Sequence, residues 1–134
     1  MISTIVPALT ALAAVQPSWQ EHHCADPQNQ AQMNACAAID FEAADAELNA
    51  VWREAVEGAR AADAELDREF DQRPTTEEKL REAQRAWIVF RDAHCTVEGY
   101  DEARGGSMEP MVYDGCRARL TRERTAQLRG RVEP

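Results

Sequence analysis

Residues 83–95, with the sequence AQRAWIVFRDAHC, decide the fold that this sequence predicts. In and just after this stretch, one set of positions recurs in alternating steps of four and three: Ala83, Trp87, Phe90, His94 and Val97. That spacing is typical of the buried face of an amphipathic helix. We therefore expect a helix that turns this face inward, with Trp87 in the core of the protein.

Polar side chains of the same helix lie next to that face. Gln84, Arg91 and Asp92 are close enough to it to be partly buried. Buried polar groups need hydrogen-bonding partners, so we expect a structural polar network here. The preceding helix supplies its other members, Asp45 and Asn49.

The register between these two helices follows from a simple folding of the chain. In an antiparallel hairpin with a connection after Ala59, positions whose numbers sum to roughly 135 face each other. Leu48 then lies opposite Trp87, and Asp45 lies close to Arg91. We therefore predict a partly buried ion pair between Asp45 and Arg91.

The whole chain has the composition of one folded helical domain. It has 134 residues, of which 29% are charged and 44% hydrophobic, with only six Gly and six Pro. This length suits a single domain with a core of moderate size. The formal net charge of −9 argues against nucleic acid as a ligand, because phosphates need a basic surface, and it favours a cationic partner.

The first residues predict export. Residues 2–15 form an apolar run of signal-peptide length that is too short to span a bilayer, and residues 11–13, ALA, resemble a cleavage site. The usual Lys or Arg before such a run is missing, so a buried N-terminal segment or a start codon assigned too late is the alternative. We expect residues 1–16 to be a signal peptide, residues 17–134 to form the mature domain, and the protein to be periplasmic or secreted, with no membrane span.

A first long helix is predicted from near Asn29. Its apolar seam follows steps of four and three through Ala37, Phe41, Ala44, Leu48, Val51 and Ala55. After Gly58 the sequence stays rich in helix formers as far as Phe70, so the helix either continues or breaks once near Gly58. Pro74 stops the pattern, since the residue before a proline disfavours the helical region.

Two further helices complete the prediction. Thr75 and Glu78 have the spacing of a capping box that starts the second helix, which we expect to end near Glu98. Residues 99–110 contain several Gly and are expected to form an exposed loop. Ser107 then caps a third helix that has Pro110 in its first turn. Without alternating strand patterns, the fold class is all-α, a small antiparallel bundle of three main helices.

Four cysteines support the predicted export: Cys24, Cys36, Cys95 and Cys116. An even count in an oxidising compartment predicts two disulfides, and the helix register places all four at one end of the bundle. Of the three possible pairings, the local ones, Cys24 with Cys36 and Cys95 with Cys116, are favoured over a bridge between Cys36 and Cys95. Each bridge would contribute on the order of 3 kcal/mol.

Several short motifs follow one another over nearly all of the mature chain. They are Cys36, residues 44–49 (ADAELN), 84–88 (QRAWI), 90–92 (FRD), Cys95, 105–107 (GGS), Cys116, Thr121, 124–125 and Leu128. As an ordered set they resemble the N-terminal domain family of the lysozyme inhibitor LprI. The resemblance implies a small exported helical domain with disulfides, and the name-giving member is a lipoprotein that inhibits lysozyme. This chain has no evident lipidation cysteine, because His22 and His23 precede Cys24, so membrane attachment is not expected.

The sequence carries no pattern of a catalytic or cofactor site. It has no G-x-S-x-G, no phosphate-binding Gly loop and no H-E-x-x-H, so we expect neither enzymatic activity nor a cofactor. A metal site is a second possibility, because several donors could gather at one bundle end: His22, His23, Cys24, His94 and Cys95. Zinc needs reduced cysteines, and disulfides explain these cysteines better, so no metal is expected.

Without catalysis, a cofactor or a metal, the remaining class of function is protein binding. Lysozymes are in general strongly basic with an acidic catalytic cleft, so an acidic inhibitor would be steered toward them. The candidate contacts lie in and beside the loop after the second helix: Tyr100, Asp101, Glu102, Arg104 and Ser107. Arg104 could meet a carboxylate of the cleft, and Tyr100 could serve as an aromatic anchor.

A different class of function remains open. In this alternative the loop only connects two helices, and the domain is a structural or adaptor domain of the cell envelope without lysozyme inhibition. Such a domain would bind another exported protein through the arginines of the third helix, including Arg119 and Arg122.

Overall fold

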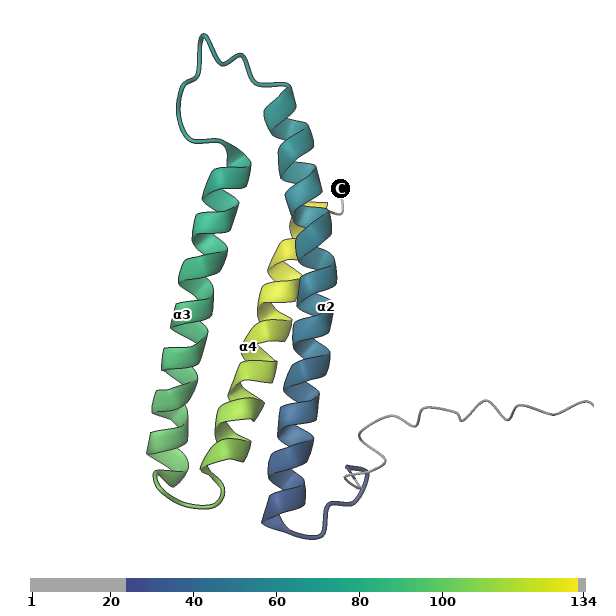
Figure 1. The fold of residues 1–134 in the computed structure, drawn as a ribbon, viewed down its shortest axis with the longest axis vertical. Helices are drawn as coiled ribbons and strands as arrows, with labels where there is room; N and C mark the ends of the chain where they lie inside the picture. Colours follow the sequence, from purple (N-terminus) through teal and green to yellow (C-terminus); the bar gives the residue numbers. More distant parts are fainter. Residues whose placement is uncertain (1–23, 133–134) are drawn as a thin grey trace, which may run out of the picture.

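The computed structural model describes residues 24–132, which form three long helices. Helix α2 spans Gln30–Ala64, α3 spans Thr76–Ala103 and α4 spans Glu109–Val132. Helices α2 and α4 run in one direction and α3 runs in the other, with no strand in the described part of the chain (Figure 1). The predicted all-α bundle with two disulfides is confirmed.

The predictions for the N-terminal segment concern residues that the structure does not describe. The signal peptide expected at residues 1–16 lies outside the described residues, as do His22 and His23. None of the three helices is long and apolar enough over its length to cross a bilayer.

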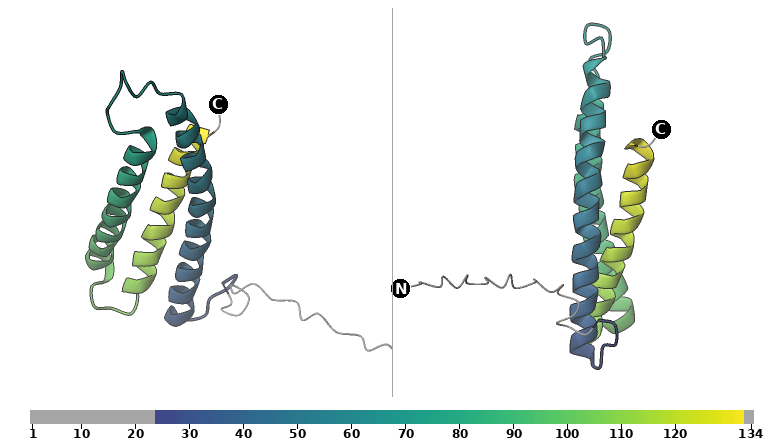
Figure 2. Two further views of the ribbon diagram at one scale, coloured as in Figure 1. Left: turned by 45° about the horizontal axis from the view of Figure 1, so that its top comes forward. Right: turned by 90° about the vertical axis from the view of Figure 1, so that its right-hand side faces the viewer.

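Helix α4 packs against both other helices and so completes the bundle. Its C-terminal end stops before the end of the hairpin formed by α2 and α3, whose connection extends beyond it (Figures 1 and 2). At the opposite end of the molecule, the start of α2, the end of α3 and the start of α4 come together. The bundle therefore has one end built from three helices and one end built from two.

The first helix starts close to Asn29, as predicted, and the second has the predicted capping box. The Asn29 side chain accepts a hydrogen bond from the backbone N–H of Gln32, and α2 begins at the next residue. Thr75 and Glu78 form a complete capping box at the start of α3. Gly58 does not interrupt α2, which settles the choice between a continuous and a broken helix.

Helix α2 ends earlier than its composition indicates. It stops at Ala64, so the prediction of a helical pattern up to Phe70 is wrong, and Phe70 is 91% exposed. The carboxylate of Asp67 accepts hydrogen bonds from the backbone N–H groups of Glu69 and Phe70. Such local turns compete with the helix for backbone donors.

Helix α3 ends later than expected, at Ala103 and not near Glu98. Gly99 is a buried residue inside the helix, where an added Cβ would lie 3.5 Å from the Cγ of Glu109. This is an ordinary van der Waals distance, so Gly99 packs against α4 as a small residue and does not end the helix. The connection shrinks to residues 104–108, and Gly105 takes its positive φ of 75°.

The start of α4 agrees with only part of the prediction. Pro110 stands in the first turn, as expected. Ser107 lies two residues before Glu109, where the helix begins, so its predicted place as the cap is wrong. Its backbone carbonyl instead accepts a hydrogen bond from the side-chain amide of Asn34 at 2.9 Å, which ties the connection to α2.

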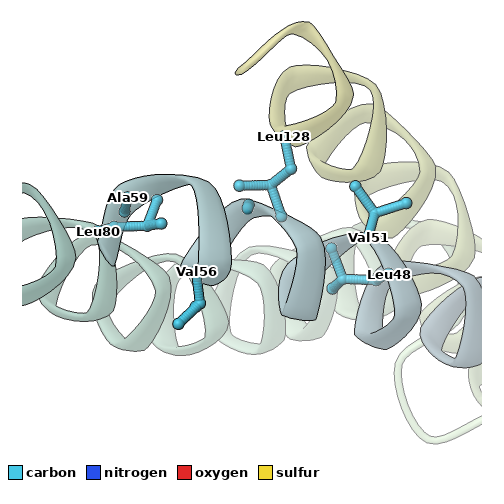
Figure 3. Packing of buried hydrophobic residues seen from close by; sticks show 7 residues of the cluster. Leu48, Val51, Val56, Ala59, Leu80 and Leu128 are labelled. Carbon is cyan, nitrogen blue, oxygen red and sulfur yellow. The ribbon is translucent and has the colours of Figure 1, made fainter. Parts of the chain in front are cut away.

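The apolar core lies along α2, as its seam predicts. Residues of all three helices form one buried cluster: Leu48, Val51, Ala55, Val56, Ala59, Leu80 and Leu128. Leu128 points from α4 toward Val51 and Leu48 (Figure 3). Trp52 and Trp87 pack against this cluster and remain partly buried, so Trp87 lies at its edge and not at its centre.

The prediction of which face of α3 is buried is wrong. Ala83 and His94 are exposed, and Phe90 and Val97 are 56% and 55% exposed. The residues that α3 buries are instead Leu80, Gln84, Arg91, Cys95 and Gly99. The inward face thus includes two long polar side chains, Gln84 and Arg91, so apolar spacing alone selected the wrong side.

Helix α4 has the same property. Its buried positions follow steps of four and three, but most of them are small or polar: Asp114, Ala118, Thr121, Thr125 and Leu128, together with Cys116. No buried side-chain nitrogen or oxygen among the described residues lacks a hydrogen-bonding partner. A satisfied polar interior therefore joins α3 to α4.

Candidate functional site

Arg91 is the centre of the polar interior. Its side chain is 8% exposed, and its Nη1 lies 3.6 Å from a carboxylate oxygen of Asp45, so α2 and α3 have the register that the sequence predicts. Its Nε donates to Asp92 at 2.9 Å, and its Nη1 donates to the Thr121 hydroxyl at 3.3 Å. The guanidinium thus contacts groups from all three helices.

Aromatic rings complete the surroundings of this cation. The guanidinium carbon of Arg91 lies 5.0 Å from the ring centre of Phe41 and 5.1 Å from that of Trp87. Arg117 also lies over Phe41, 3.8 Å from its ring centre, and over Tyr113, 4.4 Å from its ring centre. Cations stacked on rings gain electrostatic attraction while they stay partly desolvated.

The remaining residues of the expected polar network divide into two groups. Asn49 donates to Asp45 at 3.2 Å and so belongs with Arg91. Gln84 lies elsewhere, and its side-chain oxygen accepts a hydrogen bond from the Nε of Arg124 at 2.9 Å. Burial, with the nearby charge of Arg131 as a second cause, lowers the pKa of Arg124. The contact of Gln84 with Arg124 joins α3 to α4, whereas that of Asn49 with Asp45 lies within α2 and is exposed.

Sequence reasoning missed several members of this interior. Thr121, Phe41, Arg117 and Arg124 each contact a predicted residue or its ring neighbours. The available signal was the spacing of Asp114, Ala118, Thr121, Thr125 and Leu128, which keeps a helical seam without apolar side chains. A search for polar as well as apolar periodicity would have found it.

Both disulfides lie at the end of the bundle where the three helices meet. Cys24 is bonded to Cys36, and Cys95 is bonded to Cys116, so the favoured local pairing is confirmed. The second bridge is buried between α3 and α4, with Cys95 0% and Cys116 2% exposed. It fixes the two helix ends that carry the connection 104–108.

The predicted contact residues do lie together at this end, although most of them are helical. Tyr100, Asp101 and Glu102 belong to the last turn of α3, and only Arg104 and Ser107 lie in the connection. The guanidinium carbon of Arg104 lies 4.3 Å from the ring centre of Tyr100, which is 42% exposed. Asp101 and Glu102 are exposed and have no ion-pair partner within the described residues.

A shallow recess lies between the connection 104–108 and the start of α4. It has a volume of about 480 Å³ and is lined by Gly105, Gly106, Glu109, Pro110 and Tyr113. The carboxylate of Glu109 accepts a hydrogen bond from the backbone N–H of Gly105 at 2.6 Å, which holds the connection in place. The end of the bundle thus offers an aromatic ring, a cation and two carboxylates on a braced support.

Most arginines of α4 form ion pairs with acidic residues of the same chain. Arg119 pairs with Glu98, Arg122 pairs with Asp40 and Arg129 pairs with Glu47. The Arg122 guanidinium lowers the pKa of Asp40, mainly through their hydrogen bond. These ion pairs join α4 to its two neighbours, so the basic face predicted for a partner is largely neutralised.

One group of side chains has the spacing of metal donors. His94, Glu98 and Cys116 offer donor atoms that lie within 4.8 Å of one another. Cys116 is oxidised in its disulfide, and Glu98 also pairs with Arg119. This leaves His94 and one engaged carboxylate, fewer ligands than a zinc site uses.

Known proteins resemble this chain in sequence and in fold. Residues 21–128 match the family model described as lysozyme inhibitor LprI. An uncharacterized protein of Rhizobium meliloti (strain 1021) is 44% identical over 131 residues, which cover 95% of this chain and 94% of that protein. A solved structure of a DUF1311 family protein from Pseudomonas putida KT2440 has a TM-score of 0.63 and 26% identity, covering 79% of this chain and 95% of its own.

Proposed function

Because the chain belongs to the LprI lysozyme-inhibitor family, we propose that it is an exported binding protein that inhibits a basic lysozyme by direct contact, without catalysis or cofactor. The family match over residues 21–128 carries this proposal. The net charge of −9 supports it, since opposite charge speeds the encounter with a basic enzyme. The two disulfides support a periplasmic or secreted location.

The disulfide end of the bundle is the surface proposed for this contact. Arg104 stacks there on Tyr100, which lies in the last turn of α3, and the connection that starts at Arg104 is tied down by Glu109 and by Asn34. A braced connection loses little freedom on binding, which favours affinity. In this proposal Arg104 meets an acidic residue of the cleft, while Asp101 and Glu102 meet basic groups around it.

The test is stoichiometric inhibition of cell-wall lysis by a basic lysozyme. Inhibition is expected at low ionic strength and is expected to weaken as salt is added, because salt screens exposed charges. The variants Arg104→Ala and Tyr100→Ala should each weaken inhibition at least tenfold, as central interface residues often do. The matched control is Arg53→Ala, an exposed arginine on α2 far from this end.

Two results would refute the proposal in different ways. If the wild-type protein leaves lysis unchanged even at low ionic strength, lysozyme inhibition is wrong. If inhibition occurs but survives both substitutions, the binding surface is wrong.

The adaptor function is the alternative, and the structure bears on its test. Charge reversal at Arg119 and Arg122 would break the internal ion pairs with Glu98 and Asp40 as well as any contact with a partner. A pull-down from envelope extract, with lysozyme as an added bait, separates the two functions more cleanly. Capture of another exported protein in place of lysozyme would favour the adaptor.

A further inference from the structure

Helix α3 exposes a continuous apolar stripe on the side away from the bundle. Its members are Ala86, Val89, Phe90, Ala93, Val97 and Tyr100, here called the outer stripe, and all six are exposed. Val89 is 71% exposed, Phe90 56% and Val97 55%, which is unusual for large apolar side chains on one helix. Grouped apolar exposure of this kind marks an interaction surface.

The spacing shows that the stripe is one helical face. Its members follow steps of three and four and repeat after seven residues, as Ala86, Ala93 and Tyr100 show. At about 1.5 Å per residue the stripe is about 21 Å long. Helices α2 and α4 both pack on the opposite side of α3, and no other described element covers the stripe (Figures 1 and 2).

We propose that the outer stripe binds the outer stripe of a second copy of this chain, with the two α3 helices antiparallel and a two-fold axis at Ala93. This inference is independent of the proposed lysozyme inhibition. We propose a second copy of the chain as the partner because the outer stripe is complementary to itself in this orientation. Around Ala93, positions whose numbers sum to about 186 lie at the same height on the two helices.

The apolar members fit this arrangement. Ala93 meets its own copy, and a small residue at the axis lets two backbones approach closely. Ala86 stands at the height of Tyr100, so the smallest side chain faces the largest at both ends of the stripe. Phe90 lies on the same edge as Val97 and within a residue of its height, which pairs the two large side chains across the interface.

The charges fit as well. Glu82 lies four residues before the stripe and Arg104 four residues after it, so the two residues stand at the same height on the paired helices. Within its own chain, Glu82 pairs with Lys79 at the surface. Each chain thus brings an acidic group to the height of a basic group of the other chain, twice in one dimer. Charge complementarity of this kind sets the orientation of paired helices more than their affinity.

The expected dimer is weak. A single pair of helical stripes lies at the lower end of specific protein interfaces, for which micromolar dissociation constants are common. Two chains of net charge −9 repel each other, so added salt should strengthen the association. Lysozyme inhibition has the opposite salt dependence, and this difference separates the two proposals. Tyr100 and Arg104 belong to both surfaces, so the dimer is measured without lysozyme.

Sedimentation equilibrium of the wild-type protein over a concentration series, up to about 1 mM, gives the dissociation constant. Ala93→Glu should raise that constant at least tenfold, because it places two carboxylates at the axis. Val89→Glu should have a similar effect. The matched control is Ala50→Glu, the same change at an exposed position in the middle of α2, and it should leave the constant within threefold.

A charge swap tests the orientation. Glu82→Arg and Arg104→Glu should each weaken the dimer, whereas the double variant should restore it, since both pairs are then opposite in charge again. A wild-type protein that stays monomeric at all concentrations would overturn the proposal, and so would a dimer that is unchanged by Ala93→Glu and Val89→Glu. A double variant weaker than either single variant would overturn the antiparallel arrangement.

Discussion

At the scale of single residues, Arg91 shows how this protein uses a buried charge. The guanidinium contacts Asp45, Asp92 and Thr121 and lies beside the rings of Phe41 and Trp87. A charge that leaves water needs both partners and hydrogen bonds to offset its desolvation. Arg91 has them from all three helices, so we expect it to contribute to the stability of the fold.

Substitution of this residue tests that role. Arg91→Met keeps much of the side-chain volume but removes the donor to Thr121 and the contacts with both rings. We expect the free energy of unfolding to fall by about 1–3 kcal/mol in urea denaturation. The matched control, Arg85→Met on the exposed side of α3, should change it by less than about 0.5 kcal/mol. Equal effects of both substitutions would show that the buried contacts of Arg91 contribute nothing.

At the scale of an element, the start of α3 depends on a residue of α2. The Asp63 carboxylate accepts hydrogen bonds from the backbone N–H groups of Thr76 at 2.9 Å and of Glu77 at 2.8 Å. These are donors that the first turn of a helix leaves without an intrahelical partner. The hydrogen bond from Glu77 is the largest cause of a lowered pKa at Asp63. This contact joins the two helices where α4 no longer lies between them.

The lowered pKa fixes how the stability depends on pH. A carboxyl whose pKa falls on folding stabilises the protein fully above its ordinary pKa, about 4, and loses that effect as the pH drops through the folded value. Asp63→Ala should therefore lower the melting temperature at neutral pH. The difference from the wild type should shrink below about pH 4 and vanish once the carboxyl is protonated in both states.

Thermal melts of both proteins across this pH range measure the effect. Glu54→Ala, at an exposed position of the same helix, serves as the control and should show no such dependence on pH. A gap between the wild type and Asp63→Ala that stays constant into acid would contradict the assigned contact.

At the scale of the whole molecule, the disulfides strengthen the end where the three helices meet. The bridge between Cys95 and Cys116 spans 21 residues and is buried between two long helices, whereas the bridge between Cys24 and Cys36 spans 12 and is only partly buried. A longer closed loop removes more freedom from the unfolded chain. The two bridges should therefore differ in their contribution to stability.

Paired substitutions by Ala measure that difference. Removal of Cys95 and Cys116 together should lower the free energy of unfolding by about 3 kcal/mol or more, because a buried contact is lost with the bridge. Removal of Cys24 and Cys36 together should cost less. Urea denaturation of both variants under non-reducing conditions gives the two values, and the reverse order would contradict this account.

The sequence by itself determined the three helices, their order, the seam of α2 and the capping box at Thr75, and it favoured the cysteine pairing that is observed. Each of these follows from local rules, namely periodic apolar spacing, turn chemistry and the short distance between partners along the chain. The register between α2 and α3 followed from the same rules, and the contact between Asp45 and Arg91 agrees with it. The positions of Tyr100, Asp101, Glu102 and Arg104 near one bundle end also followed.

Only the tertiary structure decided which side of α3 faces inward. Apolar spacing favoured Phe90 and Val97, yet the helix buries Gln84 and Arg91, since Asp45, Thr121 and Arg124 on the other helices satisfy their polar atoms. The hairpin register predicted the contact with Asp45, but Thr121 and Arg124 lie on α4, whose position against α3 no local pattern gives. The same inward rotation leaves the outer stripe exposed.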